Sequence, residues 1–361
     1  MRNRLGAYFA WCVCVISSFT AVAQKVEWDI DFNTVFDNRE GDRTYNDPKT
    51  FLHTQLSPEV GISLMDGTHA IMGGVVWTQP IGCEWTGHRI SPTLYYRYKS
   101  GSGWAFSFGM FPKLQLLESM PNYIWNDSIN YLQRNIRGAL IQYSGVKGCF
   151  EGVLDWRGMQ TDTQREAFNI IVRGEWRPNN LLLAGGLVMM NHYAKQKKPP
   201  MGQAIVDNFV INPYVGVNLK SKTLLDSLTI KVGALTGITR HRAEGEWKTP
   251  TGVWMEGVVE KKWFGLKETF YYGGRLFPYY DESAWMLHQG EPFYQSKYFS
   301  RTQLYGYILR NSFMNLQASL DFNVAQNCFI FYQRLILRIY IDSAIFKHGV
   351  WDKNKKLKGI Y

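Results

Sequence analysis

Long apolar runs and paired cysteines are scarce in this sequence of 361 residues. Beyond the first two dozen residues, no segment approaches the roughly 18 consecutive apolar residues of a membrane-spanning helix. Of the five cysteines, Cys12 and Cys14 lie near the N-terminus. The other three, Cys83, Cys149 and Cys328, are odd in number and widely spaced, so they predict neither a disulfide framework nor a CxxC metal or redox site. We therefore expect no metal and no cofactor.

Catalytic signatures are also missing. The chain contains no GxSxG, no HExxH and no phosphate-binding glycine loop. Hydrolysis would need a nucleophile, a base and an orienting group that converge in space. Among the seven histidines, only His192, beside Asn191 at the end of an alternating segment, is a candidate base. The sequence therefore predicts that the protein is not an enzyme, with a barrel hydrolase of lipids or peptides as the alternative.

The first 23 residues are typical of a secretory signal peptide. Arg2 and Arg4 form a basic start, residues 5–20 are apolar or small, and Ala21-Val22-Ala23 matches a cleavage site. We expect export and a mature chain that begins at Gln24. An uncleaved membrane anchor is the alternative.

What the chain does contain is a rhythm of alternating apolar and polar residues. About sixteen such segments run from residue 29 to residue 342, or fourteen if two weak ones fail. The gaps between them are alternately long and short: the two residues Asp66-Gly67 join one pair of segments, whereas residues 112–134 separate another. The gap at residues 326–327 is the exception, being short where a long one is expected. This rhythm predicts an all-β, antiparallel, up-and-down transmembrane barrel of a Gram-negative outer membrane.

Residue parity assigns the two faces of each predicted strand. Within residues 313–324, every second residue is polar, Asp321 among them, and the interleaved residues, such as Leu320, are all apolar. A large soluble β-protein would alternate too. Here the apolar faces are unusually pure, and aromatic residues such as Trp104 and Trp176 stand at the ends of strands. This pattern is typical of a barrel in lipid.

In its signal peptide, strand number, loop asymmetry and aromatic strand ends, the mature chain resembles outer-membrane porins. The resemblance implies a polar lumen that conducts small hydrophilic solutes, assembly as a homo-oligomer, and an inward-folded loop, for which residues 112–134 and 278–297 are the candidates by length. We thus expect a signal peptide over 1–23, a barrel over 24–342 and a tail over 343–361. The lysine-rich tail departs from the porin pattern, in which the last strand ends the chain on an aromatic residue.

By parity, charged residues of both signs are expected to face the lumen. The formal net charge of +10 indicates a basic excess that would favour anions. The alternative is that these charges pair with one another and fill the interior. The predicted pore-lining residues are Arg97, Arg137, Glu151, Asp155, Arg157, Arg173, Glu175, Lys231, Glu256, Arg275, Asp321, Arg334 and Arg338.

The sequence thus favours a porin-like channel in the outer membrane for small, possibly anionic, hydrophilic solutes. A barrel hydrolase and a plugged barrel that binds a surface partner are the alternatives. The expected partners are outer-membrane lipid, small polar solutes and the barrel-assembly machinery. Nucleic acid is not expected, because an exported chain without basic-aromatic motifs offers it no recognition surface.

Overall fold

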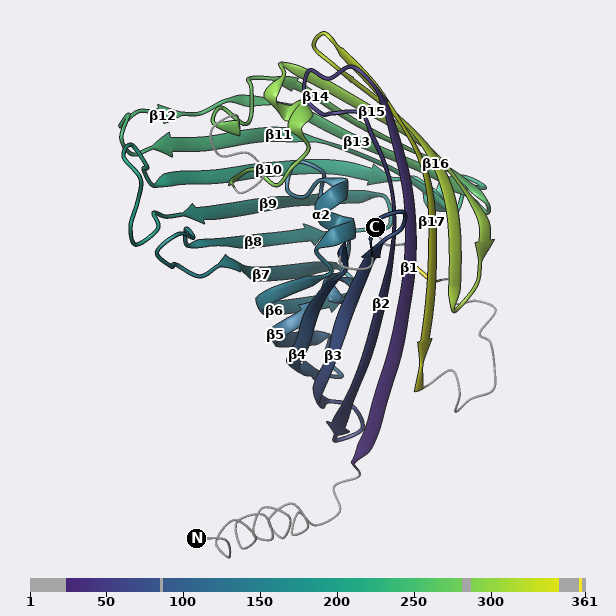
Figure 1. Ribbon diagram of the computed structural model, residues 1–361. Helices are drawn as coiled ribbons and strands as arrows, with labels where there is room; N and C mark the ends of the chain where they lie inside the picture. The colour runs from purple at the N-terminus through teal and green to yellow at the C-terminus, as the bar shows by residue number, and fades with distance from the viewer. Residues whose placement is uncertain (1–23, 85–86, 281–286, 344–356, 359–361) are drawn as a thin grey trace, which may run out of the picture.

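The computed structural model describes residues 24–84, 87–280, 287–343 and 357–358. This part of the chain forms one antiparallel sheet that closes on itself, because β1 pairs with both β2 and β17 (Figure 1). The predicted signal peptide and most of the predicted tail lie outside the described residues. The strands are β1 (Lys25–Gly41), β2 (Lys49–Leu64), β3 (His69–Pro80), β4 (Arg89–Lys99), β5 (Trp104–Pro112), β6 (Asn135–Gly145), β7 (Gly148–Gly158), β8 (Ala167–Trp176), β9 (Leu182–Tyr193), β10 (Val206–Asn218), β11 (Ser227–His241), β12 (Trp247–Lys248), β13 (Thr251–Lys261), β14 (Phe264–Gly273), β15 (Tyr298–Arg310), β16 (Met314–Ala325) and β17 (Cys328–Asp342).

The predicted sixteen-strand barrel is confirmed. β12 is a two-residue extension that pairs only with β11, so the wall itself has sixteen strands. Each wall strand pairs with its neighbours in the sequence, which is the up-and-down order. In the part of the chain that the structure describes, none of the helices is long and apolar enough to cross a membrane.

Tight turns close one end of the barrel, as the alternation of gap lengths predicts. Between β2 and β3, the central turn residues Asp66 and Gly67 have φ values of 53° and 87°. This left-handed geometry is the one that two-residue hairpins require. The short turn between β16 and β17, with Asn327 at φ 56°, is also present, but it lies among the long connections. The long connections lie at the other end of the barrel.

Parity separates the two faces of the wall. On β16, Leu320 is 43% exposed whereas its neighbour Asp321 is fully buried. On β7, Phe150 and Trp156 are exposed and Glu151 is buried. Outward-facing apolar side chains and inward-facing polar ones are the arrangement of a barrel in lipid.

Two of the long connections fold into the barrel, and these are the two candidates for an inward loop. Residues 113–134 contain a 3-10 helix, η2 (Lys113–Gln115), and the helix α2 (Asp127–Leu132), which lies inside the ring of strands (Figure 1). Residues 287–297 contain η4 (Pro292–Gln295) and bind the first segment through backbone hydrogen bonds, including Asn126 N to Gln289 O at 2.7 Å. The side chains of Tyr123, Trp125 and Tyr294 are almost completely buried. The middle of the barrel is therefore filled with protein.

Candidate functional site

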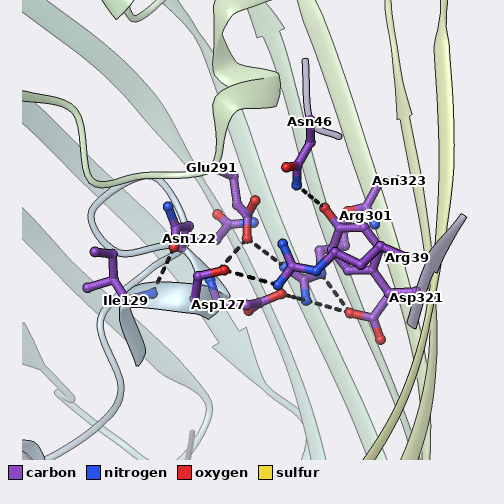
Figure 2. A network of polar contacts seen from close by, with 12 residues as sticks. Arg39, Asn46, Asn122, Asp127, Ile129, Glu291, Arg301, Asp321 and Asn323 are labelled. Atoms are coloured by element: carbon purple, nitrogen blue, oxygen red, sulfur yellow. Dashed lines mark hydrogen bonds and ion pairs between the residues drawn. The ribbon is translucent and has the colours of Figure 1, made fainter. Parts of the chain in front are cut away.

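A buried ionic network fixes α2 to the barrel wall (Figure 2). Asn126 caps the helix by accepting a hydrogen bond from Ile129 N at 2.9 Å. Asp127, in the first turn, forms ion pairs of 2.7 Å with Arg301 on β15 and 2.9 Å with Arg334 on β17. Both arginines also pair with Asp321 on β16. Three wall strands thus hold one end of a six-residue helix.

The charges in this network balance closely. Burial by itself raises the pKa of Asp127, but Arg301 and Arg334 outweigh it, so the pKa of this carboxyl lies well below its usual range. Burial and the neighbouring Asp127 charge raise the pKa of Glu291, which accepts a hydrogen bond from Asp127 N at 3.2 Å. A second cluster joins Arg134, at the end of the inward segment, and Arg338 on β17 to Asp31 on β1.

Most of the predicted lining residues have the inward parity and are engaged in pairs. Arg173 binds Glu151 at 2.6 Å and Lys231 binds Glu175 at 3.0 Å. That these residues line a conducting pore stays a prediction. The residues placed inside are Arg97, Glu151, Asp155, Arg157, Arg173, Glu175, Lys231, Glu256, Asp321, Arg334 and Arg338.

Two of the predicted lining positions are wrong. Arg137 has the parity of the exposed Ile141 on β6, so its side chain starts from the outward face of the wall. Arg275 is exposed and lies beyond Gly273, where β14 ends, so strand parity does not apply to it. Conversely, Arg301 was missed although its parity on β15 is inward. Asp127, Arg134 and Glu291 lie in connections, where no periodic signal exists.

The wall has a notch at the end that carries the long connections. The β4–β5 ladder stops at Leu94 and Met110, so residues 89–93 of β4 pair only with β3. On the other side, the β6–β7 ladder stops at Gly138 and Asp155, although β7 continues beside β8 to Gly158. The hairpin of β5 and β6 therefore separates from both neighbours near its tip.

A cavity of about 900 Å³ occupies this notch. Its lining includes the outward-facing residues Met110 and Trp156 and the inward-facing residues Thr78 and Asp155, so both faces of the wall contribute to it. The inner side is formed by residues 132–135, which directly follow α2 or belong to its last turn. The ionic network at the start of α2 thus positions one wall of the cavity.

Many polar side chains contribute to the lining of the notch. They include Arg89, Ser91, Gln133, Arg134, Asn135, Arg137, Asp155, Arg157, Gln164 and Gln289. Arg89 and Arg137 are exposed and form no ion pair within the described part of the chain. Unpaired guanidinium groups are suited to bind phosphate or carboxylate. Amide and hydroxyl groups suit a ligand rich in hydroxyls.

Asp155 is the carboxylate at the floor of this cavity. Its Oδ1 accepts a hydrogen bond from Arg137 N at 3.1 Å, in the place where the β6–β7 ladder ends. Its other oxygen, Oδ2, receives no hydrogen bond from the described residues and is thus available to a water molecule in the cavity. Nearby, burial lowers the pKa of Lys113 to about 7, against the opposing effect of the Asp155 charge.

His192, the candidate base from the sequence, lies elsewhere. It has outward parity on β9 and stacks on Phe168 with ring centroids 4.7 Å apart. Asp207 stands opposite it across the β9–β10 pair, but the Asp207 carboxylate binds Arg240 and Arg242. His192 is therefore part of an aromatic row on the lipid-facing wall, together with Trp156 and Phe168. Within the described residues, no group of three His, Cys, Asp or Glu side chains could hold a metal ion.

Comparison with known proteins identifies a family. The model of the lipid A 3'-O-deacylase-type family matches residues 19–347, which is most of the chain. No curated protein sequence matches it. Because the family is one of enzymes, the prediction that the protein is not an enzyme is wrong. The lack of a short catalytic motif was a poor guide, because catalytic residues that come together only in the fold leave no local signature in the sequence.

Solved structures with the same architecture are outer-membrane proteins of Pseudomonas aeruginosa. OccD3 (OpdP) superposes with a TM-score of 0.52 at 8% identity, over 90% of this chain and 93% of that one. OpdK has a TM-score of 0.50 at 9% identity, over 88% of this chain and 99% of that one. At such identities the likeness is one of fold. It bears out the porin-like architecture predicted from the sequence.

Proposed function

Since the chain belongs to the lipid A 3'-O-deacylase-type family, we propose that it is an outer-membrane hydrolase that removes a fatty-acyl chain from an anionic glycolipid. The observation that carries the proposal is the notch. A lipid cannot reach a closed lumen from the membrane, whereas a cavity lined from both faces of the wall would admit a headgroup while the acyl chains stay outside.

The lining of the notch matches the parts of such a substrate. Arg89 and Arg137 would bind its anionic group, and the amide and hydroxyl side chains would bind its sugar. Below the notch, Leu94 and Phe108 are 57% and 60% exposed on the outward face and offer an apolar surface to acyl chains. The wall and the cavity together fit an amphiphile that lies in the outer leaflet.

We assign Asp155 as the general base. Its free oxygen would take a proton from a water molecule, whose oxygen attacks the acyl carbonyl carbon. The ester bond between that carbon and the sugar oxygen then breaks, the sugar oxygen takes up the proton, and a fatty acid leaves. The backbone N–H of Arg137 orients Asp155, while the Arg137 side chain, which starts from the outward face, keeps its role in binding the anionic group.

The test is fatty-acid release from vesicles that contain lipid A, measured by mass spectrometry with the full chain. We expect release by the wild type, a fall of at least 100-fold in Asp155→Asn, and a fall of about 10-fold in Arg137→Gln. Lys248→Gln is the matched control, because Lys248 forms an exposed pair with Glu244 and neither residue lines the notch. No release by the wild type, or equal activity in Asp155→Asn, would contradict the proposal.

A passive channel is the second candidate, and one observation favours it. The interior keeps cavities of about 380 and 430 Å³ beside the inward segment, and charged residues line both. The buried aromatic residues in the middle of the barrel oppose free passage. Single-channel recording decides: stepwise conductance supports passage of small anions, and a silent bilayer with active hydrolysis argues against it.

A further inference from the structure

A polar cluster lies on the lipid-facing side of β14 and β15. Glu268 has outward parity on β14, and its two carboxylate oxygens accept hydrogen bonds from Ser300 Oγ at 2.7 Å and Thr302 Oγ1 at 2.5 Å. On the same strand, Phe264 and Tyr272 are exposed, each four residues from Glu268. Aromatic residues mark the two membrane interfaces, so Glu268 lies near the middle of the hydrocarbon layer.

A carboxylate is costly at this depth. Two hydroxyl donors satisfy only part of its hydrogen-bonding capacity, which extends to about four sites. Charged or polar side chains that face lipid are rare, and they are usually covered by protein. The cluster therefore indicates a surface that is shielded from lipid in the membrane.

A second polar side chain faces lipid three strands away. Gln333 has outward parity on β17, and its amide has no hydrogen-bond partner within the described part of the chain. Gln333 and Glu268 each lie five residues from the end of the strand that carries the long connections, which places them at similar depth. The Gln333 amide can donate a hydrogen bond, and the Glu268 carboxylate can accept a further one.

Between them lies an apolar pair. Leu304 on β15 and Leu320 on β16 stand opposite each other in the ladder, and each is 43% exposed on the outward face. Leu320 is also the cross-strand partner of Gln333. With strands about 4.8 Å apart, Glu268 and Gln333 flank this leucine pair on either side of a patch about 14 Å wide.

We propose that this face of β14–β17 is the interface of a homodimer. A two-fold axis along the membrane normal, passing the Leu304–Leu320 pair, would bring Gln333 of each copy to Glu268 of the other. Such an interface is self-complementary: each copy donates one amide hydrogen bond and accepts one. The leucines of the two copies pack at the centre. The interface depends on the membrane placement of the barrel and not on its hydrolytic activity.

Cysteine cross-linking in membranes tests the geometry. In a full chain with all five native cysteines replaced by serine, Leu320→Cys places a thiol next to the axis. Val188→Cys on β9, where the native residue is 46% exposed on the outward face, is the matched control on another part of the wall. We expect oxidation to cross-link Leu320→Cys at least tenfold more than the control. Equal cross-linking of the two variants would overturn the proposal.

The hydrogen bonds are tested separately. Adding Gln333→Leu to the Leu320→Cys chain removes both donors, and we expect the dissociation constant of the dimer to rise about tenfold or more. Leu335→Met, an apolar change at the next outward position of β17, should leave it unchanged. Heat-modifiable migration on gels checks that each variant has folded. An equal dissociation constant in Gln333→Leu would overturn the pairing with Glu268.

Discussion

Replacing Arg334 with methionine should detach α2 from the barrel wall. The Arg334 side chain is fully buried, and it binds Asp127 at 2.9 Å, Asp321, and the Tyr131 hydroxyl at 2.9 Å. Removing one partner from a buried ion pair costs about 3–5 kcal/mol, because the opposite charge stays behind unpaired. Arg301 still binds both carboxylates, so we expect the low end, about 3 kcal/mol.

Hydrogen exchange measures this loss directly. A cost of about 3 kcal/mol raises the population of the open segment roughly 100-fold, since every 1.4 kcal/mol is a factor of ten. Three backbone amides are hydrogen-bonded in α2 or its caps: those of Ile129, Asn130 and Gln133. Their protection against hydrogen exchange should fall by that factor. Fatty-acid release should also fall, because residues 132–135 line the cavity although Arg334 does not.

Two control variants distinguish this cause from general damage. Arg310→Met breaks a partly exposed pair with Glu260, and should leave the protection of α2 unchanged. Arg334→Met combined with Asp321→Leu should restore part of the protection, because the second change removes the excess negative charge and leaves Arg301 paired with Asp127. A loss below threefold in Arg334→Met, or an equal loss in Arg310→Met, would refute the reasoning.

Three further outcomes are expected. Burial, assisted by the Arg157 charge, lowers the pKa of His288 from 6.5 to about 3. Neutral His288 therefore stabilises the 287–297 segment above pH 6.5. This stability is lost as the pH falls from 6.5 toward 3. Between pH 7 and pH 5 the loss is about 2 kcal/mol, measurable by exchange and absent in His288→Phe. Asn126→Ala should cost α2 about 1 kcal/mol, seen as faster exchange at Ile129. Ser91→Trp should fill the notch and lower fatty-acid release at least tenfold, whereas tryptophan at the exposed turn residue Val146 should not.

The sequence predicts the periodic features of this protein well and its long-range contacts poorly. Strands repeat every two residues, so alternation marked the wall and gave Glu151 and Asp321 their inward parity. The same rule fails for Arg137, because the inward side chains of β6 include those of Ile136 and Leu140, and for Arg275, which lies beyond the end of its strand. A slip of one position moves a side chain to the other face of the wall.

The site is less accessible to such reasoning than the wall. The notch exists because two ladders end early, at Leu94–Met110 and at Gly138–Asp155, and a ladder end is a property of strand pairs. The network around Asp127 joins residues more than 170 positions apart. Neither has a periodic or local signature in the chain.

By itself, therefore, the sequence determined the all-β barrel, its sixteen strands and the position of its tight turns, because alternation and turn residues act between near neighbours. Only the tertiary structure decided that the inward segments fill the lumen, that charges expected to line a pore are paired, and that two early ladder ends leave a notch beside Asp155. These features arise from contacts between strands and segments that are distant in the sequence, and for such contacts closure of the barrel sets the geometry.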